Sequence, residues 1–209
     1  MLKEFVAIQY SPFRVPVIYG FVSIQTVDAA TSFVLISRKD ARRMGRRFIV
    51  RGLDRDGHAA NFCETEHVLV HKKASGSFTI ASHLQIRGSI PLLWQMKPNL
   101  AWAPPVTVTT NFDESLLASQ KHVKETQADY TRQYFVNLID KKGSQKRIGD
   151  KFTKITEALQ DPNIEYAWFD FHGECKKMKW ENLSKLVDIV KQKMFSYGHF
   201  MAELQVGFG

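Results

Sequence analysis

Short apolar runs rich in β-branched residues fill the first part of the chain. Strands are predicted over 14–25 and 32–37, because both runs are bounded by Pro, Gly or Ser. Strand-like runs also occur in 46–71, where they flank Asp54–Gly57, an Asp/Gly-rich stretch typical of a tight turn. This part of the chain is therefore predicted to be β-rich.

The β pattern continues through 77–88 and 89–94. Two other segments of the first half do not follow this pattern. One is 37–45, which is predicted to form one or two helical turns, with Ser37 as the N-cap and Gly45 just past the end. The other is 97–108, which holds three prolines and is predicted to be an extended surface connection.

Helical periodicity appears in the second half of the chain. A helix is predicted over 112–130 with Asp113 as its N-cap, and another over 150–160 with Asp150 as its N-cap. A third helix is predicted to stop near Gly198. The apolar positions that recur at helical spacing in the last two are Phe152, Ile155 and Leu159, then Leu183, Leu186, Val187, Val190 and Met194.

Two strands are predicted between these helices. They cover 133–140 and 164–171, and the basic segment 141–147 is predicted to be a loop. The second strand is nearly continuous in apolar residues, which is typical of burial on both faces of a sheet. The alternation predicts an α+β or α/β fold: a mixed β-sheet flanked by helices and preceded by a β-rich piece.

The formal net charge is +8, so an anionic partner is expected. The basic residues form three clusters: Arg38, Lys39, Arg42, Arg43, Arg46, Arg47 and Arg51; Lys141, Lys142, Lys146 and Arg147; and Lys176, Lys177 and Lys179. Together they favour a cationic face for polyphosphorylated groups or an anionic bilayer, although each alone is more often a solvated surface. Nucleic acid is the weaker choice, because the aromatic residues sit in strand patterns rather than between the clusters.

Membrane insertion and secretion are not expected. No apolar run approaches the ~18 residues of a spanning helix, and the N-terminal residues lack the features of a signal peptide. Cys63 and Cys175 form neither a CxxC pair nor a zinc spacing, and in a reducing compartment they stay thiols. We expect a chain that faces the cytosol and uses no metal or cofactor.

Neither cysteine fits a phosphatase nucleophile. A thiolate that attacks a phosphate monoester needs an arginine six positions later, so that the guanidinium and the loop amides share the phosphoryl oxygens. That position holds Leu69 after Cys63 and Glu181 after Cys175. A semi-buried structural thiol is therefore expected at Cys175.

Two further residues can each be interpreted in two ways. His172 directly follows the apolar strand, where open sheets bind ligands. It either contacts substrate or is satisfied by a backbone carbonyl. Arg87 stands beside the turn residue Gly88, and it either offers a bidentate contact to phosphate or forms a structural salt bridge.

Four segments closely resemble hallmark motifs of the Sac-domain phosphoinositide phosphatases, in family order and spacing. They are "RRFIVRGLDRDGHAANFCETEH" (46–67), "LQIRGSIPLLWQMKPNL" (84–100), "FVNLIDKKGSQKRIGDKF" (135–152) and "WFDFHGECKKMKWENLS" (168–184). The details are most similar to the endoplasmic-reticulum and Golgi type, which prefers phosphatidylinositol 4-phosphate. The resemblance implies a metal-independent phosphatase that works through a phosphocysteine, on the cytosolic face of those membranes.

The resemblance also implies a division of the chain. Residues 1–45 are expected to be the C-terminal part of the Sac N-terminal subdomain, and 46–209 the first part of the catalytic domain, ending before the family's Cys-x5-Arg loop. No residue here is therefore expected to be catalytic. The residues expected to line the substrate groove are Arg51, Asn61, Glu64, Arg87, His172, Lys176 and Lys177.

Three functional hypotheses follow. The chain is part of a phosphatidylinositol phosphate phosphatase, or it is a catalytically inactive module that holds phosphoinositide headgroups on an anionic membrane. The third hypothesis is an incomplete gene product, whose half-built sheet would expose a strand edge and an apolar face.

Overall fold

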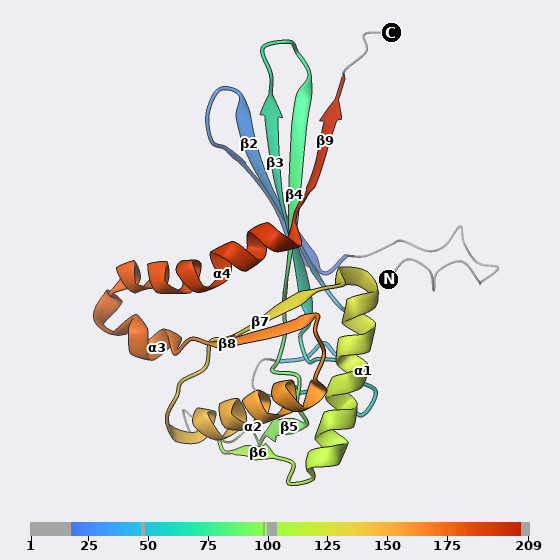
Figure 1. The fold of residues 1–209 in the computed structure, drawn as a ribbon, viewed down its shortest axis with the longest axis vertical. Helices are drawn as coiled ribbons and strands as arrows, with labels where there is room; N and C mark the ends of the chain where they lie inside the picture. Colours follow the sequence, from blue (N-terminus) through green and yellow to red (C-terminus); the bar gives the residue numbers. More distant parts are fainter. Residues whose placement is uncertain (1–17, 47–48, 98, 100–103, 206–209) are drawn as a thin grey trace, which may run out of the picture.

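The computed structural model describes residues 18–46, 49–97, 99 and 104–205, and its main feature is a projecting antiparallel sheet (Figure 1). The strand order is β1-β2-β3-β4-β9. The strand bounds are β1 Gly20–Thr26, β2 Thr31–Lys39, β3 Cys63–Lys72, β4 Phe78–Arg87 and β9 Phe200–Leu204. The predicted strands 32–37 and 77–88 are confirmed, and the described part of 14–25 contains β1.

The predicted helical turns over 37–45 are wrong. Ser37 to Lys39 continue β2, where they pair with Thr65 to Cys63 of β3. The backbone groups of this segment are already satisfied by the sheet ladder, so the local helix signal is overridden.

The segment between β2 and β3 forms a compact loop. The tight turn at Asp54–Gly57 is confirmed, since the Gly57 amide donates to the Asp54 carbonyl at 3.2 Å. Gly57 has φ +93°, and a Cβ there would lie 2.7 Å from the His122 amide nitrogen, so the turn requires glycine. Around the turn there is only the isolated bridge Leu53–Ala59 within 49–62.

A second small sheet lies beneath the helices. It pairs β5 (Trp94–Met96) with β6 (Val106–Val108). The predicted strand 89–94 is thus mostly irregular, and the described end of the extended connection 97–108 is a strand.

Helix α1 (Phe112–Tyr130) has the predicted bounds, but its N-cap is Asn111, whose side chain accepts from the Glu114 amide. Helix α2 (Gly143–Leu159) begins inside the segment predicted as a basic loop. Asp150 is therefore not a cap. It lies inside α2, where it accepts from Lys146 one turn earlier at 2.7 Å.

The parallel strands β7 (Gln133–Asn137) and β8 (Ile164–Trp168) lie between α2 and α4 (Leu183–Tyr197) (Figure 1). All of β8 is half-buried, so the predicted burial on both faces is wrong for the described chain. Helix α4 stops at Gly198 as predicted, but it has no buried residue. The short helix α3 (Phe171–Glu174) and two 3-10 turns, Lys176–Met178 and Trp180–Asn182, lead from β8 into α4.

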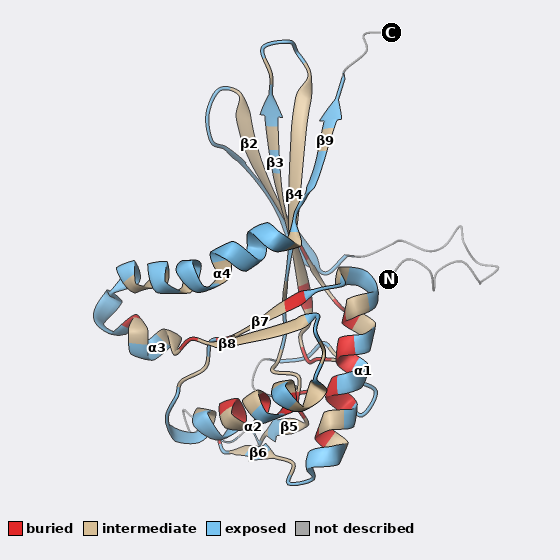
Figure 2. Ribbon diagram, in the orientation of Figure 1, coloured by how far each residue is buried: buried red, intermediate tan, exposed pale blue. Residues whose placement is uncertain are grey.

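The hydrophobic core lies under α1 and α2 (Figure 2). Leu92, Ile148, Phe152 and Ile155 form one cluster, with exposures between 0% and 4%. A mixed α+β fold with helices flanking strands is confirmed. The five-stranded sheet takes strands from both sides of residues 45 and 46, and the domain boundary there stays a prediction.

Candidate functional site

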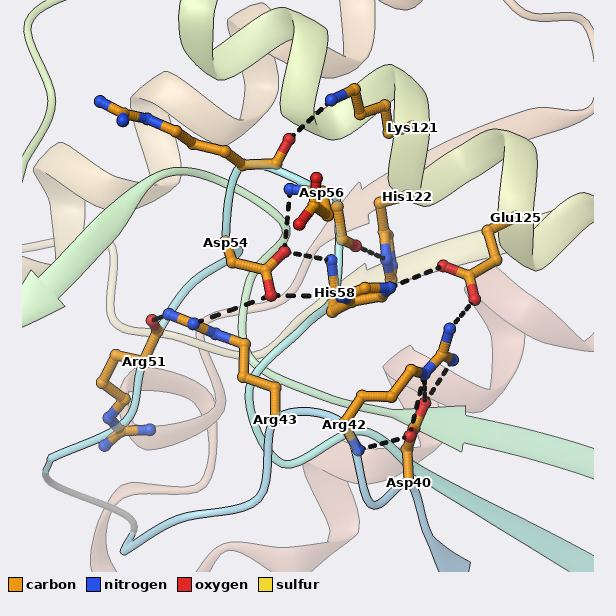
Figure 3. Close-up of polar contacts among 12 residues, drawn as sticks. Asp40, Arg42, Arg43, Arg51, Asp54, Asp56, His58, Lys121, His122 and Glu125 are labelled. Carbon is orange, nitrogen blue, oxygen red and sulfur yellow. Dashed lines mark hydrogen bonds and ion pairs between the residues drawn. The ribbon is translucent and has the colours of Figure 1, made fainter. Parts of the chain in front are cut away.

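Asp54 organises the loop of the first hallmark segment (Figure 3). Its Oδ1 accepts the amides of Asp56 at 3.0 Å and His58 at 2.9 Å, and its Oδ2 lies 3.2 Å from His58 Nδ1. Because a carboxylate only accepts, this Nδ1 carries the hydrogen. Burial opposes ionisation, but these hydrogen bonds and the His58 ring hold the pKa of Asp54 below its usual range.

A second group of charges ties this loop to α1. The Arg42 Nε donates to the two Asp40 oxygens at 2.8 and 3.1 Å, and the guanidinium also pairs with Glu125 of α1. Burial opposes ionisation of Asp40, yet the Arg42 hydrogen bonds keep its pKa low. His122 of α1 donates Nδ1–H to the Gly57 carbonyl at 2.9 Å, and burial lowers its pKa.

Most acidic side chains of this network are paired with cations. The acids Asp40, Asp54 and Glu125 each have a cationic partner, and Arg43 donates to the Arg51 carbonyl at 3.0 Å. The network therefore fixes the loop on α1 and positions the residues around it.

Arg51 and Asn61 lie in this loop. The Arg51 guanidinium carbon stands 5.5 Å from the centre of the Trp94 ring, a cation–π distance. Asn61 has φ +54°, and its Oδ1 accepts the Gly45 amide at 3.4 Å. Arg51 is thus held against a residue of β5, and Asn61 by a contact within the loop.

Glu64 and Arg87 lie on opposite faces of the five-stranded sheet. Arg87 pairs directly with Cys63 and so shares its face, and Glu64 is on the other one. Glu64 accepts from Arg38 at 2.5 Å and from the Tyr130 hydroxyl of α1 at 2.6 Å. This geometry joins Glu64 to the helices and separates it from Arg87.

Arg87 helps to lower the pKa of the Cys63 thiol. Burial raises the pKa of this thiol, but the hydrogen bonds from Ser37 and Arg87 outweigh it and the net pKa is lowered. Cys63 is 1% exposed and its Sγ lies 3.2 Å from Ser37 Oγ. Cys175 is 7% exposed, as expected for a structural thiol.

The remaining candidates lie where β7 and β8 end. His172 Nδ1 is 2.7 Å from Asp140 Oδ1, so the partner of this histidine is a carboxylate rather than a carbonyl. Asp170 accepts the amides of Gly173 at 2.8 Å and Lys141 at 3.1 Å. Burial opposes ionisation of Asp170, but the two amides hold its pKa low.

Cations surround this end of the parallel strands. Five exposed side chains have no ion pair within the described chain: Lys142, Arg147, Lys176, Lys177 and Lys179. The first cluster is different, because Arg38, Arg42 and Arg43 are paired with acids. Its other described members include Lys39 and Arg46, which have no ion pair within the described chain, and Arg47 lies outside the described residues. Several aromatic side chains are also exposed, including Trp180 at 51%, so the aromatic residues are not all core.

The structure thus divides the candidates among three places: the loop, the two sheet faces and the β7–β8 end. Sequence reasoning missed Asp140 and Asp170, although both lie just after strands β7 and β8, where parallel sheets gather polar groups. It also missed Tyr130, whose role depends on a contact 66 residues away.

No helix in the described ranges is long and apolar enough to span a bilayer. The same residues contain no group of three or more His, Cys, Asp or Glu side chains arranged to hold a metal ion.

The family model of the SacI homology domain matches residues 1–176. Phosphatidylinositol-3-phosphatase SAC1-B of Danio rerio is 36% identical over 207 residues, which cover 97% of this chain and 34% of that protein. Phosphatidylinositol-3-phosphatase SAC1 of Saccharomyces cerevisiae is 40% identical over 179 residues, covering 83% of this chain and 28% of that protein. The chain belongs to the Sac-domain phosphoinositide phosphatase family.

The chain spans between 28% and 34% of the length of the three SAC1 relatives named here. The SAC1 of Drosophila melanogaster gives the same picture, with 34% identity over 95% of this chain and 33% of that protein. The match therefore identifies the family. The relatives that are named as phosphatases are much longer than this chain.

Proposed function

We propose that this chain is part of a phosphatase that removes a monophosphate from phosphatidylinositol phosphate, with phosphatidylinositol 4-phosphate as the preferred lipid. The observation that carries the proposal is the family match over residues 1–176. The relatives' names specify the 3-phosphate, so the two ring isomers must be compared directly. We further propose that the protein acts at the cytosolic face of endoplasmic-reticulum and Golgi membranes, as expected from the resemblance.

In this proposal the described residues bind the headgroup and do not break the phosphate ester. Lys176 and Lys177 supply positive charge beside the end of β8, together with Lys142 and Arg147 from the start of α2. His172 is oriented by Asp140 on the same side. Arg51 and Asn61 would line the groove from the loop between β2 and β3, and Glu64 and Arg87 would approach it from opposite faces of the five-stranded sheet.

Vesicle co-sedimentation tests the binding step. We expect the chain to bind vesicles with phosphatidylinositol 4-phosphate more tightly than those with the 3-phosphate isomer or with unphosphorylated phosphatidylinositol. The double variant Lys176→Ala/Lys177→Ala should weaken binding about thirtyfold, because each of the two surface charges near an anionic membrane contributes about 1 kcal/mol. Added salt should weaken binding further.

The matched control is Lys154→Ala/Lys191→Ala, which removes the same charge from exposed lysines of α2 and α4 that have no ion pair within the described chain. It should change affinity less than twofold. Equal losses in the two double variants would show that binding follows net charge alone and would overturn the proposed site.

Phosphate release tests the chemical step. The sequence has no arginine six positions after Cys63 or Cys175, so these 209 residues should release no phosphate from either isomer. Turnover that survives Cys63→Ser and Cys175→Ser would show that the proposed mechanism is wrong.

A second candidate function is a catalytically inactive phosphoinositide-binding module. The unpaired cations at the β7–β8 end favour it, because they offer charge without a nucleophile. Headgroup-specific binding by the 209 residues, with no phosphate release from a longer version of the protein, would support this alternative over the phosphatase.

A further inference from the structure

The five-stranded sheet is amphipathic. Pairing partners share a face, so the register assigns every residue of the five strands to one of two sides. One side carries Val22, Ile24, Val34, Val68, Val70, Ile80, Phe200 and Leu204, and we call these eight residues the distal apolar face. The opposite side carries more polar residues, such as Gln25, His67 and His83, although Phe21, Leu69 and Met201 also lie on it.

This face is exposed on the edge strands β1 and β9 and half-buried on the three strands between them. Ile24 is 71% accessible on β1, and Phe200 and Leu204 on β9 are 63% and 51% accessible. The ends of β2, β3, β4 and β9 project beyond α4, and no described helix lies over them (Figure 1). None of these projecting strand ends is coloured as buried (Figure 2). An apolar side this large on an amphipathic sheet normally packs on another layer.

The charges on this side are confined to the base of the sheet and to one strand end. Arg38 is paired with Glu64 and Glu66 at the base, and Lys72 is at the far end of β3. Two cations and two acids leave the side without net charge. An anionic membrane would not be attracted to it, whereas a second neutral surface would meet no repulsion.

The size of the face suits a weak interface. Five strands at about 4.8 Å spacing and about six residues at about 3.3 Å each give roughly 500 Å² per copy. Two copies would bury about 1,000 Å², near the lower limit for a specific interface. Two sheets of the same twist can also stack in an aligned sandwich.

We propose that the distal apolar face is a self-association surface, on which a second copy of this chain stacks its own distal apolar face. The contact is isologous, since the same residues meet on both copies. Its small area predicts dissociation in the micromolar range.

Sedimentation velocity of the full chain between about 1 and 100 μM tests this surface. We expect a monomer–dimer equilibrium that Ile24→Lys weakens at least about tenfold, because the lysine charge would be buried without a partner. Ile24 is exposed in the monomer, so this variant should fold, and an unchanged circular dichroism spectrum checks that.

The matched control is Phe21→Lys. Phe21 lies on the same edge strand and is 52% exposed, but its pairing with Ser37 puts it on the opposite side of the sheet. This variant should dimerise like the unmodified chain. A chain that stays monomeric throughout the range, or equal losses in the two variants, would overturn the proposal.

Two further measurements distinguish a second copy from other possible occupants of the face. If residues 1–17 covered it instead, their deletion would strengthen association more than about tenfold. If a bilayer covered it, neutral phosphatidylcholine vesicles would bind the chain and Ile24→Lys would abolish that binding. Either result would overturn a second copy as the occupant.

Discussion

The helix-covered core and the projecting sheet differ in how they hold their apolar residues. Leu92 and Ile155 are 0% exposed beneath α1 and α2, whereas Ile24 on β1 is 71% exposed. Within the five strands only Ser37 and Cys63 are buried. Side-chain burial stabilises the first region, and backbone pairing in a regular register is what holds the second together. The difference predicts which region tolerates substitution.

The largest effect is expected in the core. Ile155→Ala removes buried methyl groups and leaves a cavity, which should lower the free energy of unfolding by about 2–5 kcal/mol. Ile24→Ala in the sheet should change it by less than about 0.5 kcal/mol, since that side chain is already exposed in a monomer. Urea denaturation at low protein concentration measures both. Similar losses in the two variants would mean that the sheet is covered in solution.

The second-largest loss in the free energy of unfolding is expected when the charge that links the loop to α1 is removed. Arg42→Ala leaves the Asp40 carboxylate, whose side chain is 8% exposed, without its main partner. Because Arg42 is itself 46% exposed, the expected loss is about 2 kcal/mol rather than the full value for a buried pair.

The comparator is Arg55→Ala, which also removes an ion pair to α1. Arg55 contacts Glu114 at 2.9 Å but is 85% exposed, so its loss should be below about 0.5 kcal/mol. Chemical denaturation of the two variants at the same salt concentration gives the comparison. An Arg55 effect as large as that of Arg42 would contradict the role of burial in this network.

How well the sequence predicts the structure also differs between regions. Helix α1 has its predicted bounds, although its N-cap is Asn111 and not Asp113. The start of α2 was missed because "KKGSQKR" reads as a basic loop, while the observed helix begins at Gly143 without any side-chain cap. Ser37 reads as a helix cap, but its pairing with Thr65 is a contact that local patterns do not contain.

The candidate site shows the same limit. The four hallmark segments identified the family, because a motif match depends only on the order of residues along the chain. They gave no information on sides of a strand, so Glu64 and Arg87 were grouped although the register separates them. Asp140 and Tyr130 escaped notice because each acts through a contact that only the fold creates.

A smaller effect is expected where the two regions meet. Tyr130→Phe removes the hydroxyl that donates to Glu64 at 2.6 Å and leaves the ring in place. Glu64 keeps Arg38, so the loss should be about 1 kcal/mol. Hydrogen exchange should show faster opening of the base of β3, while the core of α2 stays protected. Faster exchange in both would mean that the regions unfold as one unit.

The smallest effect is a difference in pH dependence between the two regions. Burial lowers the pKa of His122 in the core, and burial together with His67 and His199 lowers that of His83 in the sheet. A lowered folded-state pKa means that the unfolded chain binds protons first, so stability is complete above about pH 6.5 and falls as the pH drops below it. His122 is 7% exposed, so it should contribute more of this fall than the half-buried His83.

Asparagine variants separate the two contributions. Asparagine does not titrate, and at position 122 its amide can replace the Nδ1–H donor to the Gly57 carbonyl. Between pH 7.5 and 5.5, His122→Asn should reduce the fall in urea midpoint clearly, and His83→Asn only slightly. The reverse order would indicate that the sheet surface around His83 is the drier of the two, which requires a layer packed on it.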